Sequence, residues 1–261
     1  MQSNTYTSFY ADVLALTGNS SFTTTEQTRI LANANRRLYQ AYRSFSSWPR
    51  YIVGSELRPA VDSVISRDAI AGATYTISSA TRSGTVVTIT TSAPYAMFTG
   101  ATVSASVFTY DLDTGTGTET YTGSGTAVYA GISTVDSFNR IFRDNPLNLY
   151  SSVEYEFYVD VDGAHIINNF SNNSSFWVNY YKEWSGPYTA ASTDIPLEFY
   201  RFAVHATYAD YLRFDGQIDK AMAEENNAQQ YLMLEVDKAE NQRNVNSLQR
   251  RISTYNSRQS R

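Results

Sequence analysis

The chain has 261 residues and no cysteine, which excludes disulfides, thiolate metal ligands and a cysteine nucleophile. No apolar run approaches the roughly 20 residues that a membrane-spanning helix needs, so we expect no membrane association. The start, MQSNTYTSFY, has neither a basic nor an apolar signal-peptide region. We therefore expect the protein to be made and used in a cytoplasm-like compartment.

Charged residues are also few, at 17%, while 42% of residues are hydrophobic, which is typical of an ordered globular protein. Aromatic residues make up 14%, and 21 of them are tyrosines. Tyrosine suits surfaces that become half-buried against a partner, but it also favours strands. The tyrosine excess leaves both interpretations open.

Groups that carry catalysis are scarce. The two histidines, His165 and His205, have no close histidine, cysteine or acidic partner at ligand spacing in the sequence. The chain contains neither a Walker sequence nor a G-x-S-x-G motif. Glu154 and Glu156 point the same way on a predicted strand, but a solvated strand face explains them better than a glycosidase pair. We predict that the protein is not an enzyme and has no metal, catalytic residue or cofactor.

Two further acidic pairs resemble the beginning of a calcium loop. These are Asp111 with Asp113, and Asp160 with Asp162 in the segment VDVDG. No oxygen ligands follow at the required spacing, so a hairpin turn of type I′ at Asp162-Gly163 explains the second pair.

The net charge of −5 is spread unevenly. Residues 1–52 carry +3, residues 53–189 carry −7, and residues 190–261 carry −1. After Glu240 the only charged residues are arginines. This overall balance argues against a dedicated nucleic-acid-binding protein, which usually contains a basic domain.

Residues 1–52 predict a pair of helices. The first ends at Gly18, and the second begins with a capping box at Thr23 and Glu26 or at Thr24 and Gln27. The spacing of apolar residues in the second helix predicts one apolar stripe. Four arginines, at positions 29, 36, 37 and 43, fall largely off this stripe. Pro49 stops the helix, and we expect Trp48 to anchor the chain there. The stripe consists of Leu31, Ala34, Leu38, Ala41 and Phe45.

The middle of the chain predicts β structure throughout. After a connecting strand region at 53–71, 33 of the 64 residues in 72–135 are serine, threonine or glycine. Alternation in TVVTITT and ATVSASV predicts strands, and TGTGTETYTGSGTAVYAG predicts a hairpin. We interpret 72–135 as an inserted β-barrel or sandwich module. A second strand layer is predicted at 136–189.

Residues 190–241 predict a second helical pair. Asp194 is expected to cap the first of these helices, Pro196 to lie in its first turn, and Asp215-Gly216 to end it. The next helix has a narrow apolar stripe flanked by charged residues. The expected bundle seam or subunit interface consists of Leu31, Leu38, Phe45, Trp48, Phe202, Ala206, Ala209 and Leu232.

These patterns define an α+β fold, with a helical bundle built from both chain ends and a β-rich middle. The order of elements resembles the head-to-tail connector (adaptor) proteins of tailed bacteriophages. The resemblance rests on ILANANRRLYQAYRSFSSWPRY, VNYYKEW, DIPLEFYRFAVHATYADYLRFDGQIDKA and AEENNAQQYLMLEVDKAENQ, which together span about half of the chain.

The resemblance implies a structural virion protein that forms a ring, commonly dodecameric, beneath the portal protein. Such a ring extends the DNA channel, which DNA crosses without specific binding, and gives tail, nozzle or tail-terminator proteins a platform. The resemblance also implies that the basic tail at 242–261 docks on the portal. The docking residues would be Arg243, Leu248, Arg250, Arg251, Ile252, Tyr255 and Arg258.

An alternative function is a β-rich tail or receptor-binding protein whose tyrosine-rich sheet binds a surface glycan. No repeat of fixed period, which such proteins usually carry, occurs in the sequence. A hydrolase of the host wall is a third candidate, and it lacks a credible acid–base pair.

Overall fold

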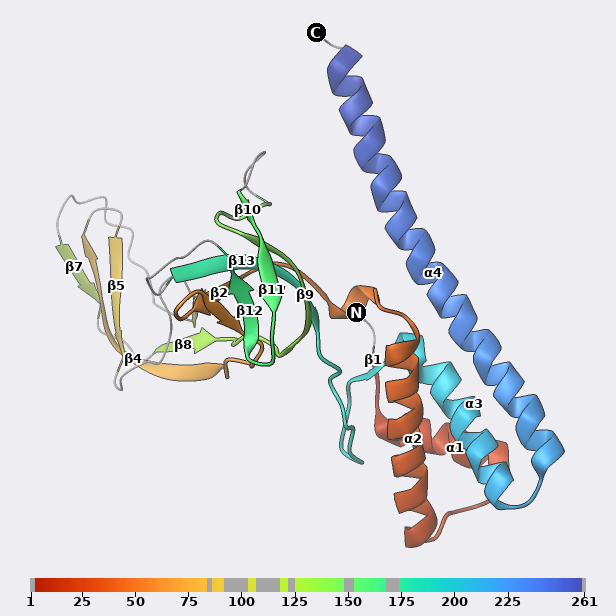
Figure 1. Cartoon of the computed structure of the whole chain (residues 1–261). Helices are drawn as coiled ribbons and strands as arrows, with labels where there is room; N and C mark the ends of the chain where they lie inside the picture. Colours follow the sequence, from red (N-terminus) through yellow and green to blue (C-terminus); the bar gives the residue numbers. More distant parts are fainter. Residues whose placement is uncertain are drawn as a thin grey trace. The chain divides into compact units, whose positions relative to one another are not determined.

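The computed structural model describes residues 3–83, 86–91, 103–106, 118–121, 125–147, 153–167 and 174–259, and it gives the backbone but not the side chains of 243–259. The fold is α+β, as the sequence predicts. The chain divides into a helical unit, residues 1–52 and 184–261, and a β unit, residues 53–183. Figure 1 labels their elements.

The N-terminal helices of the helical unit begin and end where local sequence signals place them. Helix α1 (Tyr6–Thr17) ends at Gly18, whose φ of 72° is the left-handed conformation that glycine adopts at low cost. Helix α2 (Thr24–Ser44) begins with the capping box of Thr23 and Glu26, the first of the two pairs that the sequence offers.

Trp48 fixes the end of α2. Its side chain is buried, and its indole Nε1 donates to the carbonyls of Ala41 and Tyr42, at 3.2 and 3.1 Å. These carbonyls belong to the last turn of the helix, where no amide remains to bond them. A short 3₁₀ helix η1 (Pro49–Tyr51) follows.

Helix α3 (Leu197–Phe214) starts differently from the prediction. Its N-cap is Pro196, and no side chain caps it, so the prediction that Asp194 caps this helix is wrong. The residues that precede the helix form strand β14 (Ile195–Pro196) instead, which pairs with β1 (Ser3–Asn4). The predicted break at its end is present, since Gly216 has a φ of 78°.

Helix α4 (Ile218–Gln259) is the longest element. Its 42 residues extend about 63 Å at 1.5 Å per residue, whereas the 18 residues of α3 extend about 27 Å. The two helices pack side by side, and α4 continues beyond α3 (Figure 1). The backbone therefore stays helical past residue 241, where the sequence suggests a separate tail. No helix in the described ranges is both long and apolar enough to span a membrane.

A buried ion-pair network joins α2, α3 and α4. Arg37 donates to both carboxylate oxygens of Asp210, at 2.6 and 2.9 Å, and to both oxygens of Glu225, at 2.8 and 3.1 Å. Arg36 and Arg213 add bonds to Asp210 at 2.8 and 2.9 Å. The side chains of Arg37 and Asp210 are only 9% and 7% exposed, so the prediction that Arg37 lies off the buried stripe is wrong.

The described residues of the β unit form three antiparallel sheets. In the first, the strand order is β10-β9-β13-β2, and in the second it is β11-β12-β3. Their shared core contains Ile65, Ile141 and Val178, all fully buried. The strands are β2 (Ile52–Ala60), β3 (Val64–Ser66), β9 (Val135–Phe142), β10 (Glu154–Tyr155), β11 (Phe157–Val159), β12 (Gly163–Ile166) and β13 (Ser174–Lys182).

The described part of 72–135 forms the third sheet, and whether this module is a barrel or a sandwich stays a prediction. The predicted hairpin of β7 with β8 is wrong, because both strands pair with β4 instead. β7 pairs along 80–83 and β8 along 73–77 of that strand. The strands are β4 (Ala73–Ser83), β5 (Val86–Thr91), β6 (Val103–Ser106), β7 (Thr118–Tyr121) and β8 (Gly125–Tyr129).

The hairpin of β11 and β12 is present, but its turn is not of type I′. Gly163 already pairs with Ser66 as the first residue of β12, and Asp162 has no positive φ. The two-residue turn with positive φ at both positions is Asp62-Ser63, which joins β2 to β3.

Arg58 holds together the two chain segments near Ile70 and Ile132, which we call the neck of the 72–135 module. Its side chain is 1% exposed, and its guanidinium donates to the carbonyls of Ser66, Asp68 and Ser133. Asp68 and Ser133 flank a β-bridge between Ile70 and Ile132, where the chain enters and leaves the module. Burial lowers the pKa of Arg58, while Tyr180 and Glu56 act in the opposite direction.

We expect Asp210→Asn to lower the free energy of unfolding by about 3 kcal/mol, because the buried Arg37 then loses a charged partner. Urea unfolding measures the change. Asp237→Asn, at an exposed residue of α4, is the control and should shift stability by less than about 0.5 kcal/mol.

The same variant should also alter the acid response. Burial raises the pKa of Asp210, but hydrogen bonds from Arg37 and Arg36 outweigh it and hold the pKa below its ordinary value. The stabilisation is therefore complete above about pH 4 and fades as the pH falls through the folded-state pKa. A difference between the wild type and Asp210→Asn that stays constant down to pH 2 would contradict this account.

We expect Arg58→Lys to destabilise the β unit by about 2 kcal/mol, since an ammonium cannot span three separate carbonyls and leaves acceptors unpaired. Hydrogen exchange should increase first in residues 66–71 and 130–135. Arg140→Lys is the control, because the Arg140 side chain is 58% exposed. Equal exchange in both variants would contradict the role of Arg58.

Candidate functional site: a groove on the helical unit

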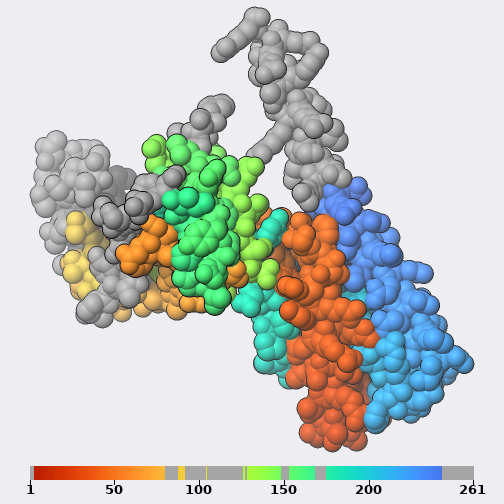
Figure 2. Space-filling view, viewed as in Figure 1, coloured from red at the N-terminus to blue at the C-terminus, as the bar shows by residue number. Residues whose placement is uncertain are grey.

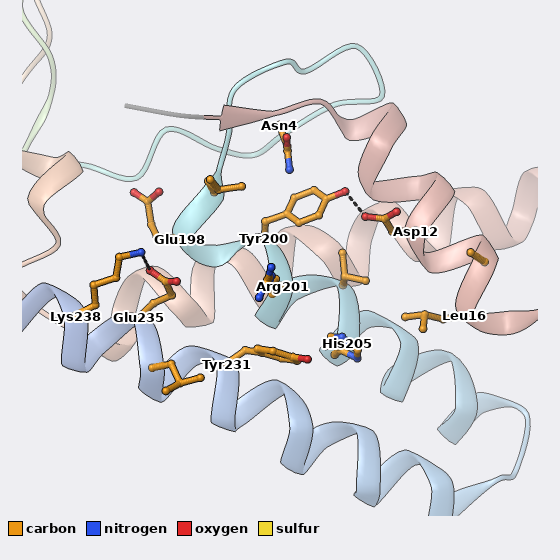
Figure 3. Close-up of a pocket in the computed structure, with 14 residues that line it drawn as sticks. Asn4, Asp12, Leu16, Glu198, Tyr200, Arg201, His205, Tyr231, Glu235 and Lys238 are labelled. Carbon is orange, nitrogen blue, oxygen red and sulfur yellow. Dashed lines mark hydrogen bonds and ion pairs between the residues drawn. The ribbon is translucent and has the colours of Figure 1, made fainter.

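A groove of about 860 Å³ lies between α1, α3 and α4, with Asn4 of β1 at its edge. Figure 3 shows α4 on one side of the groove, α3 along its centre and α1 at its far end. Ala221, Ala228 and Ala239 are buried, so the helix α4 packs closely against its neighbours at these positions.

Large apolar side chains that line this groove are exposed to solvent. Leu234 of α4 is 63% exposed, Leu197 of α3 is 40% exposed, and Leu16 of α1 is 36% exposed. Val204 also contributes to the lining. Three exposed leucines from three helices in one concave surface are more typical of a docking site than of scattered surface residues.

Asp12 and Tyr200 connect α1 to α3 within the groove. The Tyr200 hydroxyl donates to Asp12 Oδ2 at 2.6 Å (Figure 3). Burial raises the pKa of the Tyr200 phenol, and the hydrogen bond to Asp12 raises it further, so the phenol stays protonated. The pair fixes the relative positions of the two helices.

His205 and Tyr231 form a second polar cluster. His205 Nδ1 lies 2.8 Å from Glu224 Oε2, and the imidazole stacks on the Tyr231 ring at 5.0 Å. The Arg201 guanidinium lies 5.9 Å from the centre of the same ring. The expectation that His205 lacks an acidic partner is therefore wrong, because Glu224 reaches it from the next helix.

The polar groups of the groove are mostly paired with one another. Lys238 Nζ donates to Glu235 at 3.2 Å, and Arg50 donates to Glu198 at 2.7 Å. With the pairs described above, these bonds hold the walls in place. The arrangement suits a preorganised binding surface, since paired side chains lose little freedom when a partner docks.

The predicted seam residues are brought together in the helical core. Leu38, Trp48, Phe202, Ala206 and Leu232 are buried in one cluster, whereas Leu31 and Phe45 are partly buried against it. Ala209 is also fully buried.

Three buried residues of α2 are absent from the predicted stripe, namely Ile30, Arg37 and Tyr42. Ile30 and Arg37 follow the spacing 4, 3 and 4 together with Ala34 and Ala41. That spacing is the sequence signal that places Arg37 on the buried side of α2. Its partner is Asp210, an acidic residue on the buried side of α3.

The predicted portal-docking side chains, from Arg243 to Arg258, lie outside the described side chains. Their docking therefore stays a prediction. The backbone that carries them is the last part of α4. Asp111 and Asp113 also lie outside the described residues.

A group of potential metal ligands lies on the β11–β12 hairpin. Asp160, Asp162 and His165 offer ligand atoms within 4.8 Å of one another, and His165 Nε2 lies 2.7 Å from Asp162 Oδ1. The expectation that His165 has no acidic partner is wrong. Hydrogen bonding with His165 lowers the pKa of Asp162. The two aspartates are exposed, and the pairing with His165 explains the arrangement without an ion.

Comparisons of the chain with protein-family models, with curated proteins and with solved structures give no match.

We expect Tyr200→Phe to lower the free energy of unfolding by about 1 kcal/mol, because it removes the hydrogen bond between α1 and α3. Thermal and urea unfolding measure the loss. Tyr231→Phe is the matched control and keeps its stacking on His205, so its stability should equal that of the wild type. Equal stabilities of both variants would show that the Asp12–Tyr200 bond contributes nothing.

Proposed function

We propose that this protein is a structural, non-enzymatic component of a tailed-phage virion. It acts as a head-to-tail adaptor that assembles as a ring beneath the portal. The ring, with 12-fold symmetry as the family pattern implies, extends the DNA channel and gives the tail its attachment platform. The four sequence segments described above are the basis of the resemblance, and all four contribute to described elements.

The observation that carries the proposal is helix α4. Among the side chains of α4 that the structure describes, a narrow stripe enters the core, while large apolar side chains outside this stripe are exposed. Such residues become stabilising when subunits pack around a common axis. They are Ile218, Met222, Met233 and Leu234, each more than half exposed.

The tail at 242–261 supports contact with a second protein. It contains five arginines and no acidic residue. In the proposed role it docks on acidic groups of the portal through guanidinium–carboxylate pairs. DNA passes through the channel without specific binding, because an arginine cluster repeated around a ring that gripped DNA would oppose ejection.

The β unit supplies the proposed contacts with tail, nozzle or tail-terminator proteins. It carries a net charge of −7 and exposes apolar residues on the β11–β12 hairpin, where Val161 is 92% and Tyr158 55% exposed. The same hairpin favours the second candidate, a receptor-binding tail protein, because exposed aromatic residues also bind glycans.

Mixing the purified protein with the portal ring of the same virus, followed by negative-stain imaging, tests the adaptor role. We expect an added ring-shaped layer on one portal face. Deletion of residues 242–261 should abolish that layer, while replacement of the arginines in this segment by lysine keeps the charge and should retain part of the binding.

A layer that forms equally well after the deletion would leave the adaptor role intact and contradict the docking role of the tail. Failure to bind the portal, together with attachment of the protein to host cells, would replace the adaptor by the receptor-binding function.

A further inference from the structure

One charged side chain of the groove has open hydrogen-bond donors. Arg201 is exposed and has no hydrogen-bond or ion-pair partner among the described residues. Its guanidinium lies 5.9 Å from the centre of the Tyr231 ring, and Figure 3 shows it between Tyr200 and Tyr231. The three carboxylates of the lining are each bonded within the chain, and they are Asp12, Glu198 and Glu235. The donors of Arg201 are therefore open to an acceptor from outside this chain.

A second surface, on α4, carries acceptors of this kind. Six exposed residues recur along this helix at spacings of 3, 4, 4, 3 and 4, and they include two acids and no base. Neither acid has an ion-pair partner among the described side chains. Figure 2 shows the described part of α4, in blue, at the surface of the helical unit. We call this row the α4 face, and it consists of Asp219, Met222, Asn226, Gln230, Met233 and Asp237.

The α4 face and the groove lie on different sides of α4. The residues of α4 that line the groove are Tyr231, Leu234, Glu235 and Lys238. At about 100° per residue, this set and the α4 face are centred roughly 130° apart around the helix axis. The α4 face therefore points away from the groove of its own chain, and a groove that receives it belongs to another copy.

The two surfaces also match in their apolar residues. The groove offers three partly open leucines at positions 16, 197 and 234, and the α4 face offers Met222 and Met233, which are 52% and 67% exposed. Methionine is unbranched and adapts its shape to an irregular apolar surface. A helix that lays such residues into a groove between helices is a common recognition mode. Asp237 lies one turn beyond Met233, so a carboxylate accompanies this methionine towards the open donors of Arg201.

We propose that the groove receives the α4 face of a second copy of this chain. The two methionines pack on the leucines of the groove, and a carboxylate of the α4 face accepts from Arg201. Because the two surfaces differ and lie on different sides of α4, the contact is heterologous, and a pair of copies keeps one free surface of each kind. This inference deepens the proposed ring and rests on that function for its closure.

Two substitutions test the contact, one on each surface. Arg201→Glu replaces the open donors of the groove by a carboxylate, which repels the acids of the α4 face. Met233→Lys places a cation in the α4 face, where it meets Arg201. Both new residues favour helices, and both sites are exposed, so the fold should persist. The controls, Lys220→Glu and Ala32→Lys, make the same two changes of charge at exposed residues outside both surfaces.

The measurement is the mass of the full-length protein in solution, by light scattering and native mass spectrometry, at the highest concentration that stays dissolved. We expect the wild type and both controls to self-associate. Each test variant alone should associate about thirtyfold more weakly or not at all. An equimolar mixture of the two test variants should associate again, because one variant keeps an intact groove and the other an intact α4 face. Recovery in the mixture also shows that both variants are folded.

Wild-type protein that stays monomeric, test variants that associate like the wild type, or a mixture that stays monomeric would each overturn this contact. Portal binding separates that failure from failure of the adaptor role. A portal layer formed equally by the wild type and both test variants would leave the adaptor role standing without this contact. The predicted association pattern without portal binding would keep the contact and remove the adaptor role.

Discussion

The pairing of Arg37 with Asp210 and Glu225 is the interaction on which the helical unit depends. It joins a helix from the beginning of the chain to two helices from its end, across more than 170 positions of sequence. An arginine keeps its charge under all ordinary conditions, so burying it requires hydrogen-bond acceptors in fixed positions, which are carboxylates in this network. The network therefore sets the register of α2 against α3 and α4.

The β unit uses a buried arginine in another way. Arg58 is satisfied mainly by backbone carbonyls, which are dipoles and not charges, and by the face of the Tyr180 ring at 4.8 Å. Burial lowers the pKa of Arg58, whereas Asp210 and Glu225 raise the pKa of Arg37 despite its burial. Arg58 links segments of backbone, and Arg37 links helices through their side chains.

The sequence predicted the features that local chemistry decides. Helix ends at Gly18, Thr23 and Gly216 follow from capping and glycine conformation, which involve only a few neighbouring residues. Pairing between distant segments was not predictable in the same way. The strands β7 and β8 have the composition of a hairpin, yet the long strand β4 offers both of them a partner. The groove likewise depends on three helices whose packing no single segment encodes, and Glu224 reaches His205 only after the chain turns at Gly216.

The neck at Ile70 and Ile132 brings the two ends of the 72–135 module together. Chain entry and exit are bridged to each other, so the framework meets the module as it would meet a short loop. The entropy of closing a loop grows only slowly with its length, so changes of length inside the module have little effect on the framework. Arg58 bonds to backbone carbonyls on both sides of the neck, at Asp68 and Ser133. The neck therefore tolerates changes of length inside the module while the core of the first two sheets stays the same.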